Sequence, residues 1–130
     1  MDKLKLVVSW IKDYQAKNGE VRGWCWRRVR QGCQAAGLRA PSAGSAKEAF
    51  AVLSTDPGAF GWKKAERDAM GLLPDPCLMF FKGIRPWDSL SIQRFGHAAI
   101  WSAGKLYASK NYQMNSWWAK RLIGGFVVDT

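Results

Sequence analysis

The spacing of apolar residues changes once along this chain, close to Leu78. Before that point apolar residues recur every three or four positions, which is typical of amphipathic helices. After it they form short runs, such as 78–81 and 97–101, separated by turn residues, which is typical of strands. Helices followed by an antiparallel sheet predict an α+β fold, with the N-terminal helices packed against a small antiparallel β-sheet.

Three helices are expected in the first part of the chain. The first has Asp2 as a candidate N-cap and ends at Asn18-Gly19. The second begins near Cys25 and runs to about Gly37, because glycine suits the position after a helix end. The third covers residues 46–53 and is capped by Ser45 or Ser42.

The later part is expected to consist of strands and loops. A helical or irregular piece through Trp62, Ala65 and Met70 precedes the change of pattern, and a loop is expected over residues 86–95. Residues 97–101 and 105–109 predict a β-hairpin, and residues 126–128 predict a last strand. Trp117 and Trp118 are placed in the connection before that strand.

Length and composition favour one domain over residues 1–130. A chain of 130 residues, with 48% hydrophobic and 23% charged residues, can bury a core of its own. It contains no run of about 20 uncharged apolar residues of the kind that spans a membrane. Its first residues lack the apolar segment and cleavage site of a secretory signal. We therefore expect synthesis in the cytoplasm as a soluble protein.

The formal net charge of +10 favours a polyanionic partner. Nucleic acid, anionic lipid and the anionic polymers of bacterial cell walls all fit this charge. Eight tryptophans add a second feature, since exposed indoles stack on bases, although most are expected to be packing residues. A nucleic-acid-binding module without catalysis is therefore one hypothesis, although no known nucleic-acid-binding motif is present. Trp117 and Trp118 are the best candidates for a substrate groove.

One cysteine and the only histidine are the main candidates for chemistry. Cys25 is expected at a helix N-terminus, where unpaired backbone N–H groups favour the thiolate. Arg22, Arg27 and Arg28 are expected to act in the same direction. His97 follows a glycine at the head of a strand, where it can serve as the base that activates sulfur. The pattern predicts nucleophilic catalysis if folding brings the two side chains together.

A third group is expected to orient the imidazole through its second ring nitrogen. Asn111 is the first candidate, because it follows the strand expected to pair with the histidine strand, and Ser109 is the alternative. Cys33 and Cys77 are expected to be packing residues, and at least one of the three thiols is expected to be free. No zinc site is expected, because these cysteines and the histidine include no close Cys-x-x-Cys pair.

Four segments resemble CHAP domains, a family of cysteine- and histidine-dependent amidohydrolases and peptidases that is related to NlpC-type peptidases. They follow the family's order and together span roughly residues 19–128. They are Gly23 to Val29 around the cysteine, Pro74 to Phe81 as a turn and strand, Gly96 to Trp101 around the histidine, and Leu106 to Asn111. The chain departs from the family at Ser109 and Lys110, where an acidic residue and glutamine are common, and at Pro76-Cys77, where Gly-Asp is usual.

The resemblance implies a papain-like fold and hydrolysis of amide bonds in bacterial peptidoglycan. Cys25 would attack the carbonyl, His97 would act as base and then as acid, and Asn111 would orient His97. The reaction would be that of an N-acetylmuramoyl-L-alanine amidase or an endopeptidase, as in phage endolysins and interbacterial toxins. We expect a phage lysin that acts at the cell wall after release or injection.

Other properties follow from the same resemblance and from the sequence. No cofactor is expected, and no Asp-rich loop suited to calcium is seen in the sequence. The sequence carries no indication of oligomeric state, and a monomer is the default expectation. A wall-binding domain that keeps the fold without catalysis is a third hypothesis.

Overall fold

The helices lie mainly in the first half of the chain. The computed structural model describes residues 2–21 and 23–129. The helices are α1 (Lys3–Asn18), α2 (Cys25–Ala35), α3 (Ala46–Thr55), α4 (Leu90–Phe95) and α5 (Ser116–Arg121), and η1 (Pro57–Phe60) is a 3-10 turn. Within these described ranges, no helix combines the length and the apolar character that crossing a membrane requires.

In the described part of the chain, the strands form one antiparallel sheet in the order β1-β6-β2-β3-β4-β5. They are β1 (Trp62–Lys64), β2 (Cys77–Phe81), β3 (His97–Ser102), β4 (Lys105–Tyr107), β5 (Tyr112–Gln113) and β6 (Leu122–Val128). All side chains of β2 are at most 3% exposed, as its unbroken apolar run predicts. The α+β prediction is therefore confirmed.

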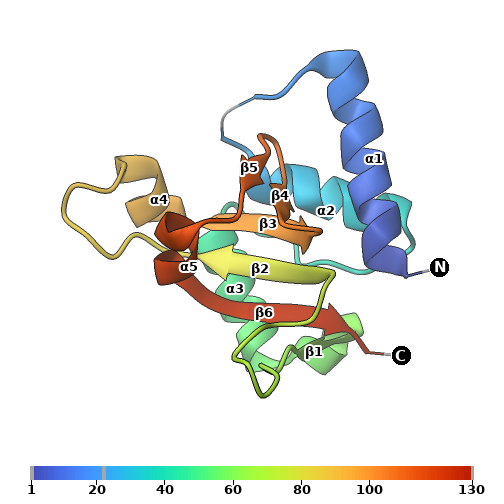
Figure 1. The fold of residues 1–130 in the computed structure, drawn as a ribbon. Helices are drawn as coiled ribbons and strands as arrows, with labels where there is room; N and C mark the ends of the chain where they lie inside the picture. The colour runs from blue at the N-terminus through green and yellow to red at the C-terminus, as the bar shows by residue number, and fades with distance from the viewer. Residues whose placement is uncertain (1, 22, 130) are drawn as a thin grey trace.

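The helices are arranged so that α2 meets the sheet near the start of β3. Figure 1 shows α2 and α3 behind the sheet, α1 along one side, and α4 and α5 near the left-hand ends of the strands. Trp26 of α2 packs on Phe80 of β2, with ring centroids 5.7 Å apart, and its indole N–H donates to the carbonyl of Pro41. This packing holds the first turn of α2 against the middle of the sheet.

The predicted caps of two helices are observed. The Asp2 carboxylate accepts a hydrogen bond from the N–H of Leu4 at 2.8 Å, and Gly19 ends α1 with φ +79°. Ser45 is the cap of α3, since its hydroxyl accepts from the N–H of Glu48 at 3.2 Å. Each cap residue pairs with a backbone donor that the helix leaves unpaired, and for this reason the caps could be predicted from the sequence.

Several short elements differ from the sequence prediction. Residues 62–64 form the edge strand β1, paired with the end of β6, instead of a helical or irregular piece. Residues 90–95 and 116–121 form α4 and α5, where a loop and a connection were expected. The last strand starts at Leu122, and β6 lies inside the sheet between β1 and β2. Each of these segments is too short to show a periodicity, so contacts with distant residues decide its structure.

Gly125 in β6 is expected to be intolerant of a side chain. A Cβ atom there would lie 2.7 Å from the Cys77 sulfur and 3.0 Å from Cδ1 of Leu73. We expect Gly125→Ala to lower the free energy of unfolding by about 1–3 kcal/mol, because a filled core must shift to admit the methyl group. Urea unfolding measures the loss.

The matched control is Gly58→Ala in η1, where the added Cβ would meet its nearest neighbour at an ordinary 3.6 Å. That variant is expected to unfold at nearly the same urea concentration as the wild type. Equal stability of the two variants would contradict the close packing described around Gly125.

Candidate functional site

Cys25 opens α2 and lies against β3. The residue before it, Trp24, has φ 60° and ψ 23°, a left-handed conformation that is rare for a bulky side chain. This turn brings the chain into the helix at the cysteine. The backbone N–H groups of Ala98, Trp26 and Cys25 itself lie near the sulfur and act to lower the pKa of the thiol. Because Ala98 follows His97 directly, the sulfur lies beside the start of the histidine strand.

The prediction that the helix terminus and nearby arginines make Cys25 a thiolate is wrong for this structure. Burial raises the pKa of the thiol above its ordinary value and outweighs the nearby backbone N–H groups, which lower it. Arg27 lies over the ring of Trp24 and Arg28 over the ring of Tyr14, at 5.3 and 3.7 Å. Neither is among the groups that shift the pKa of the thiol. Arg22 lies outside the described residues.

His97 is the first residue of β3 and pairs with Phe81 of β2. Gly96 before it has φ +68°, and a Cβ at this position would lie 3.0 Å from the Phe81 carbonyl oxygen, so the close approach requires glycine. The imidazole packs among aromatic rings, with Trp118 nearest at 4.7 Å between centroids and Tyr112 at 5.9 Å. Its Nε2 is buried and has no hydrogen-bond partner among the residues that the structure describes.

Burial lowers the pKa of His97 to about 4, so the imidazole is neutral at pH 7. An unfolded histidine titrates near 6.5, and between pH 6.5 and 4 the unfolded chain therefore binds a proton that the folded chain does not. Lowering the pH from 7 to 4 is expected to remove about 3 kcal/mol of stability through this residue, and the loss levels off just below pH 4.

This titration can be measured directly, because the chain contains one histidine. An NMR titration of the His97 ring protons is expected to show a midpoint near pH 4. Urea unfolding of wild type and His97→Gln across pH 4 to 7 isolates the contribution of His97 to the pH dependence. A midpoint near 6.5, or the same pH dependence in both proteins, would contradict the burial described here.

Cys25 and His97 both line one cleft of about 400 Å³, which we call the His97 cleft. The two residues lie 72 positions apart in the sequence, and tertiary packing brings them together. The cleft is lined by Gly23, Cys25, Ser89, Ser91, Ile92, Gly96, His97, Ser109, Lys110, Tyr112, Trp117 and Trp118. Trp117 and Trp118, the tryptophans predicted to line a groove, are among them, whereas Ser89, Ser91 and Tyr112 had no signal in the sequence.

The two candidates for an orienting residue are placed differently. The carboxamide of Asn111 exchanges two hydrogen bonds with that of Gln15 in α1, at 2.8 and 2.9 Å. Ser109 is 4% exposed and lines the His97 cleft. The structure therefore joins Asn111 to α1 and brings Ser109 to the cleft that His97 lines.

All three thiols are free; Cys33 and Cys77 are buried, and Cys25 is half-buried. Burial raises the pKa of both buried thiols to about 12, and neither side chain is exposed, so a substrate cannot reach them as it can reach Cys25. Within residues 2–21 and 23–129, no three His, Cys, Asp or Glu side chains are placed to hold a metal ion. The chemistry available at this site is therefore that of Cys25 and His97 with the surrounding backbone donors.

Two further hollows adjoin the His97 cleft. The α2–α3 cleft, of about 720 Å³, shares Cys25 with it and is lined by Gly23, Trp24, Cys25, Trp26, Arg27, Arg30, Ala43, Gly44, Ser45, Ala46, Ser91, Phe95 and Gly96. The Trp117 pocket, of about 430 Å³, shares Trp117 with it and is lined by Arg85, Trp87, Ser116, Trp117, Lys120 and Arg121. Cys25 therefore lies where two clefts meet.

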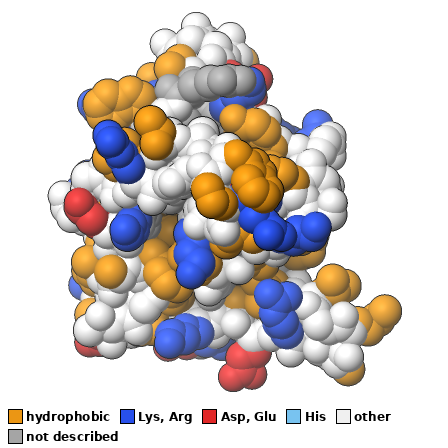
Figure 2. All heavy atoms as spheres, turned by 90° about the vertical axis from the view of Figure 1, so that its left-hand side faces the viewer, with side chains coloured by type: hydrophobic (Ala, Val, Ile, Leu, Met, Phe, Trp, Pro, Cys, Tyr) orange, Lys and Arg blue, Asp and Glu red, His pale blue; other side chains and the backbone are white. Residues whose placement is uncertain are grey.

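The three hollows are basic. Among the described residues, their lining includes four arginines and two lysines and no aspartate or glutamate. Figure 2 shows Lys and Arg side chains spread among hydrophobic ones on the face that carries α4 and α5. Such a surface attracts anionic ligands with apolar parts.

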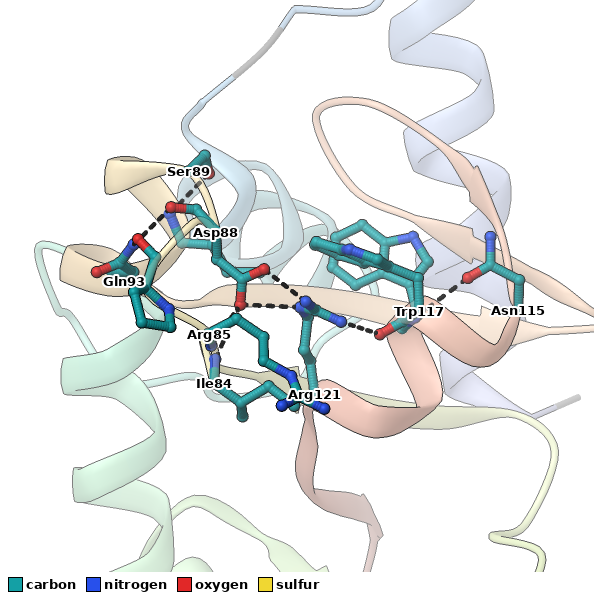
Figure 3. Close-up of polar contacts among 11 residues, drawn as sticks. Ile84, Arg85, Asp88, Ser89, Gln93, Asn115, Trp117 and Arg121 are labelled. Carbon is teal, nitrogen blue, oxygen red and sulfur yellow. Dashed lines mark hydrogen bonds and ion pairs between the residues drawn. The ribbon is translucent and has the colours of Figure 1, made fainter.

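A buried ion pair holds Trp117 of α5 in place. The Arg121 guanidinium makes a bidentate pair with the Asp88 carboxylate and donates to the Trp117 carbonyl at 2.8 Å (Figure 3). It also stacks on the Trp117 ring, 3.8 Å from the centroid. Hydrogen bonding to Arg121 lowers the pKa of Asp88 to about 2. The loop before α4 and the helix α5 are thereby held together at one end of the His97 cleft.

Neither a protein-family model nor a curated protein sequence matches the chain. Among solved structures, the chain is similar to Tae3 in the type VI native effector–immunity complex Tae3–Tai3 from Ralstonia pickettii. The TM-score is 0.60 over 96% of this chain and 93% of that chain. The two proteins share a fold. Their sequence identity is 15%, so the likeness concerns the fold and leaves the CHAP resemblance as a hypothesis from the sequence motifs.

Proposed function

We propose that this protein hydrolyses amide bonds of bacterial peptidoglycan through a cysteine nucleophile. The observation that carries the proposal is that Cys25 and His97 line one cleft although 72 positions separate them. The cysteine also begins a helix, where backbone N–H groups can stabilise a developing oxyanion. This is the arrangement that cysteine hydrolases use.

The reaction would start from a neutral thiol and a neutral imidazole, because burial raises the pKa of one and lowers the pKa of the other. His97 takes the thiol proton while the Cys25 sulfur bonds to the amide carbonyl carbon. The imidazolium then gives this proton to the leaving nitrogen, and the C–N bond breaks. Water, deprotonated by His97, hydrolyses the thioester, which returns the thiol and releases a carboxylate.

The proposal includes a residue that orients the imidazole of His97. Ser109 is the candidate that the geometry favours, because it lines the cleft that His97 lines. Asn111, the first candidate from the sequence, bonds to Gln15 and so fits better as a link between the β4–β5 connection and α1. The buried, unpartnered Nε2 of His97 is the atom that such a residue would meet.

Peptidoglycan as substrate is supported by three observations. The segments around Cys25 and His97 resemble CHAP domains, whose substrates are wall amides. The joined clefts are basic and lack acidic lining residues among those described, which suits an anionic wall. The fold is shared with a protein described as a type VI effector in complex with its immunity protein. We therefore propose action at the bacterial cell wall, by injection as an effector or by release as a phage lysin.

The test is digestion of purified sacculi, followed by counting of new amino termini and mass spectrometry of the soluble fragments. Release of fragments cut at one kind of amide is expected and identifies the bond. Intact sacculi after prolonged incubation with folded protein would overturn the proposal.

Nucleic-acid binding is the competing hypothesis, and it rests on charge and tryptophan content alone. It predicts an affinity for DNA or RNA that falls steeply with salt and does not depend on Cys25. A gel-shift series from 50 to 200 mM salt, run beside the sacculus digestion, separates the two hypotheses.

A further inference from the structure

Arg30 in α2 lies in the α2–α3 cleft with its charge unpaired. Its Nε atom is buried and has no hydrogen-bond partner within the described chain. One ion pair is found among residues 2–21 and 23–129, and it joins Arg121 to Asp88. Arg30 therefore has no carboxylate partner in the described part of the chain. A buried donor without an acceptor is unfavourable, and such groups in folded proteins usually have a reason connected with ligands or water.

Among the described residues, no carboxylate forms an ion pair with Arg30. The cleft has no acidic lining residue among those described, and Arg27 contributes a second guanidinium. The carboxylate of Glu48, in the first turn of α3, is already engaged, because it accepts a hydrogen bond from the backbone N–H of Gly44 at 3.0 Å. The cleft can therefore take up a carboxylate without losing an ion pair.

The walls of the cleft suit a ligand that is larger than a small anion. Trp24 and Phe95 line it and are 64% and 53% exposed, which gives the cleft two apolar faces open to solvent. Cys25 also lines it, so a ligand seated there reaches the sulfur. A carboxylate carried on a peptide fits both the guanidinium and the apolar walls.

We propose that Arg30 binds a carboxylate of the substrate on the α3 side of Cys25 and so selects stem peptides whose carboxylates are free. This inference rests on the proposed peptidoglycan hydrolysis, because it places the stem peptide in the cleft that contains the nucleophile. Stem peptides carry free carboxylates in some walls and amidated ones in others. A guanidinium distinguishes them, since an amide brings no charge and only one acceptor oxygen.

The test compares one disaccharide-tetrapeptide fragment in two forms, with its carboxylates free and with them amidated. For wild type we expect kcat/KM for the free acid to be about tenfold higher, as expected for a charge-assisted hydrogen bond. Arg30→Gln is expected to raise KM for the acid about tenfold, leave the amidated form unchanged and abolish the preference. Arg94→Gln, which removes an exposed positive charge outside the three hollows, is the matched control and is expected to keep the preference.

Binding of the same two fragments to the Cys25→Ala protein, measured by calorimetry, separates this inference from the proposed function. Preferential binding of the acid without turnover by wild type would leave the subsite standing and overturn the hydrolysis. Turnover of both forms at equal rates would overturn the subsite and leave the hydrolysis standing. If Arg30→Gln does not fold, Arg30→Lys replaces it, because lysine keeps the charge but loses the planar guanidinium. The Arg30→Lys protein is expected to prefer the free acid, but less strongly than the wild type does.

Discussion

Replacing Cys25 with alanine is expected to lower the rate of peptidoglycan hydrolysis by at least about 10³-fold. The sulfur is the atom that would form the covalent intermediate, and removing a nucleophile leaves only the contributions of binding and oxyanion stabilisation. Cys25 is half-buried at the edge of the core, and alanine keeps its Cβ atom, so the variant is expected to fold. Release of amino termini from sacculi, per milligram of folded protein, measures the loss.

Cys33→Ala is the matched control. Cys33 lies two turns further along α2, is fully buried and lines none of the three hollows. Its replacement is expected to lower the free energy of unfolding by about 1 kcal/mol through a small cavity, while the hydrolytic rate stays within about twofold. Full activity of Cys25→Ala, or equal losses in both variants, would contradict the role of Cys25 as nucleophile.

His97→Gln is expected to lower the rate of peptidoglycan hydrolysis by about 10²- to 10⁴-fold, because the side chain that takes and returns the proton is removed. Glutamine keeps a polar group of similar size, so the packing against Trp118 is expected to persist. Hydrolysis of sacculi by the two proteins is compared across pH 4 to 8. The wild-type rate is expected to fall as the pH approaches 4, where His97 becomes protonated.

Circular dichroism and alkylation of Cys25 by iodoacetamide are the controls for His97→Gln. Both proteins are expected to give the same spectrum and to be alkylated faster as the pH rises, since burial raises the pKa of the thiol. An unchanged hydrolytic rate in the folded variant would mean that another group acts as the base.

The two residues on which the mechanism depends could be found from the sequence. Cys25 was predicted at the start of a helix, and His97 at the head of a strand, and the structure has both there. Asn111 was chosen by the expected length of a hairpin. That argument placed Asn111 beside His97 and did not predict that its side chain pairs with Gln15 in α1, 96 positions away. A partner so distant leaves no local pattern.

The protonation state of Cys25 also could not be predicted from the local sequence. A helix N-terminus can be predicted from a sequence, and its backbone donors do act to lower the pKa of the Cys25 thiol. The burial that outweighs them depends on how α2 is packed against β3, and the sequence carries no measure of it. For this reason the thiolate prediction was wrong although its local premise was right.

The sequence by itself determined the α+β class, the caps of α1 and α3, and the two residue types able to carry out nucleophilic catalysis, because these depend on patterns within a few positions. Only the tertiary structure decided that β6 lies inside the sheet, that short segments become α4 and α5, and that Cys25 stands where two basic clefts meet. Desolvation and the pairing of distant groups depend on what surrounds a side chain in three dimensions, and neighbours in sequence are a small part of those surroundings.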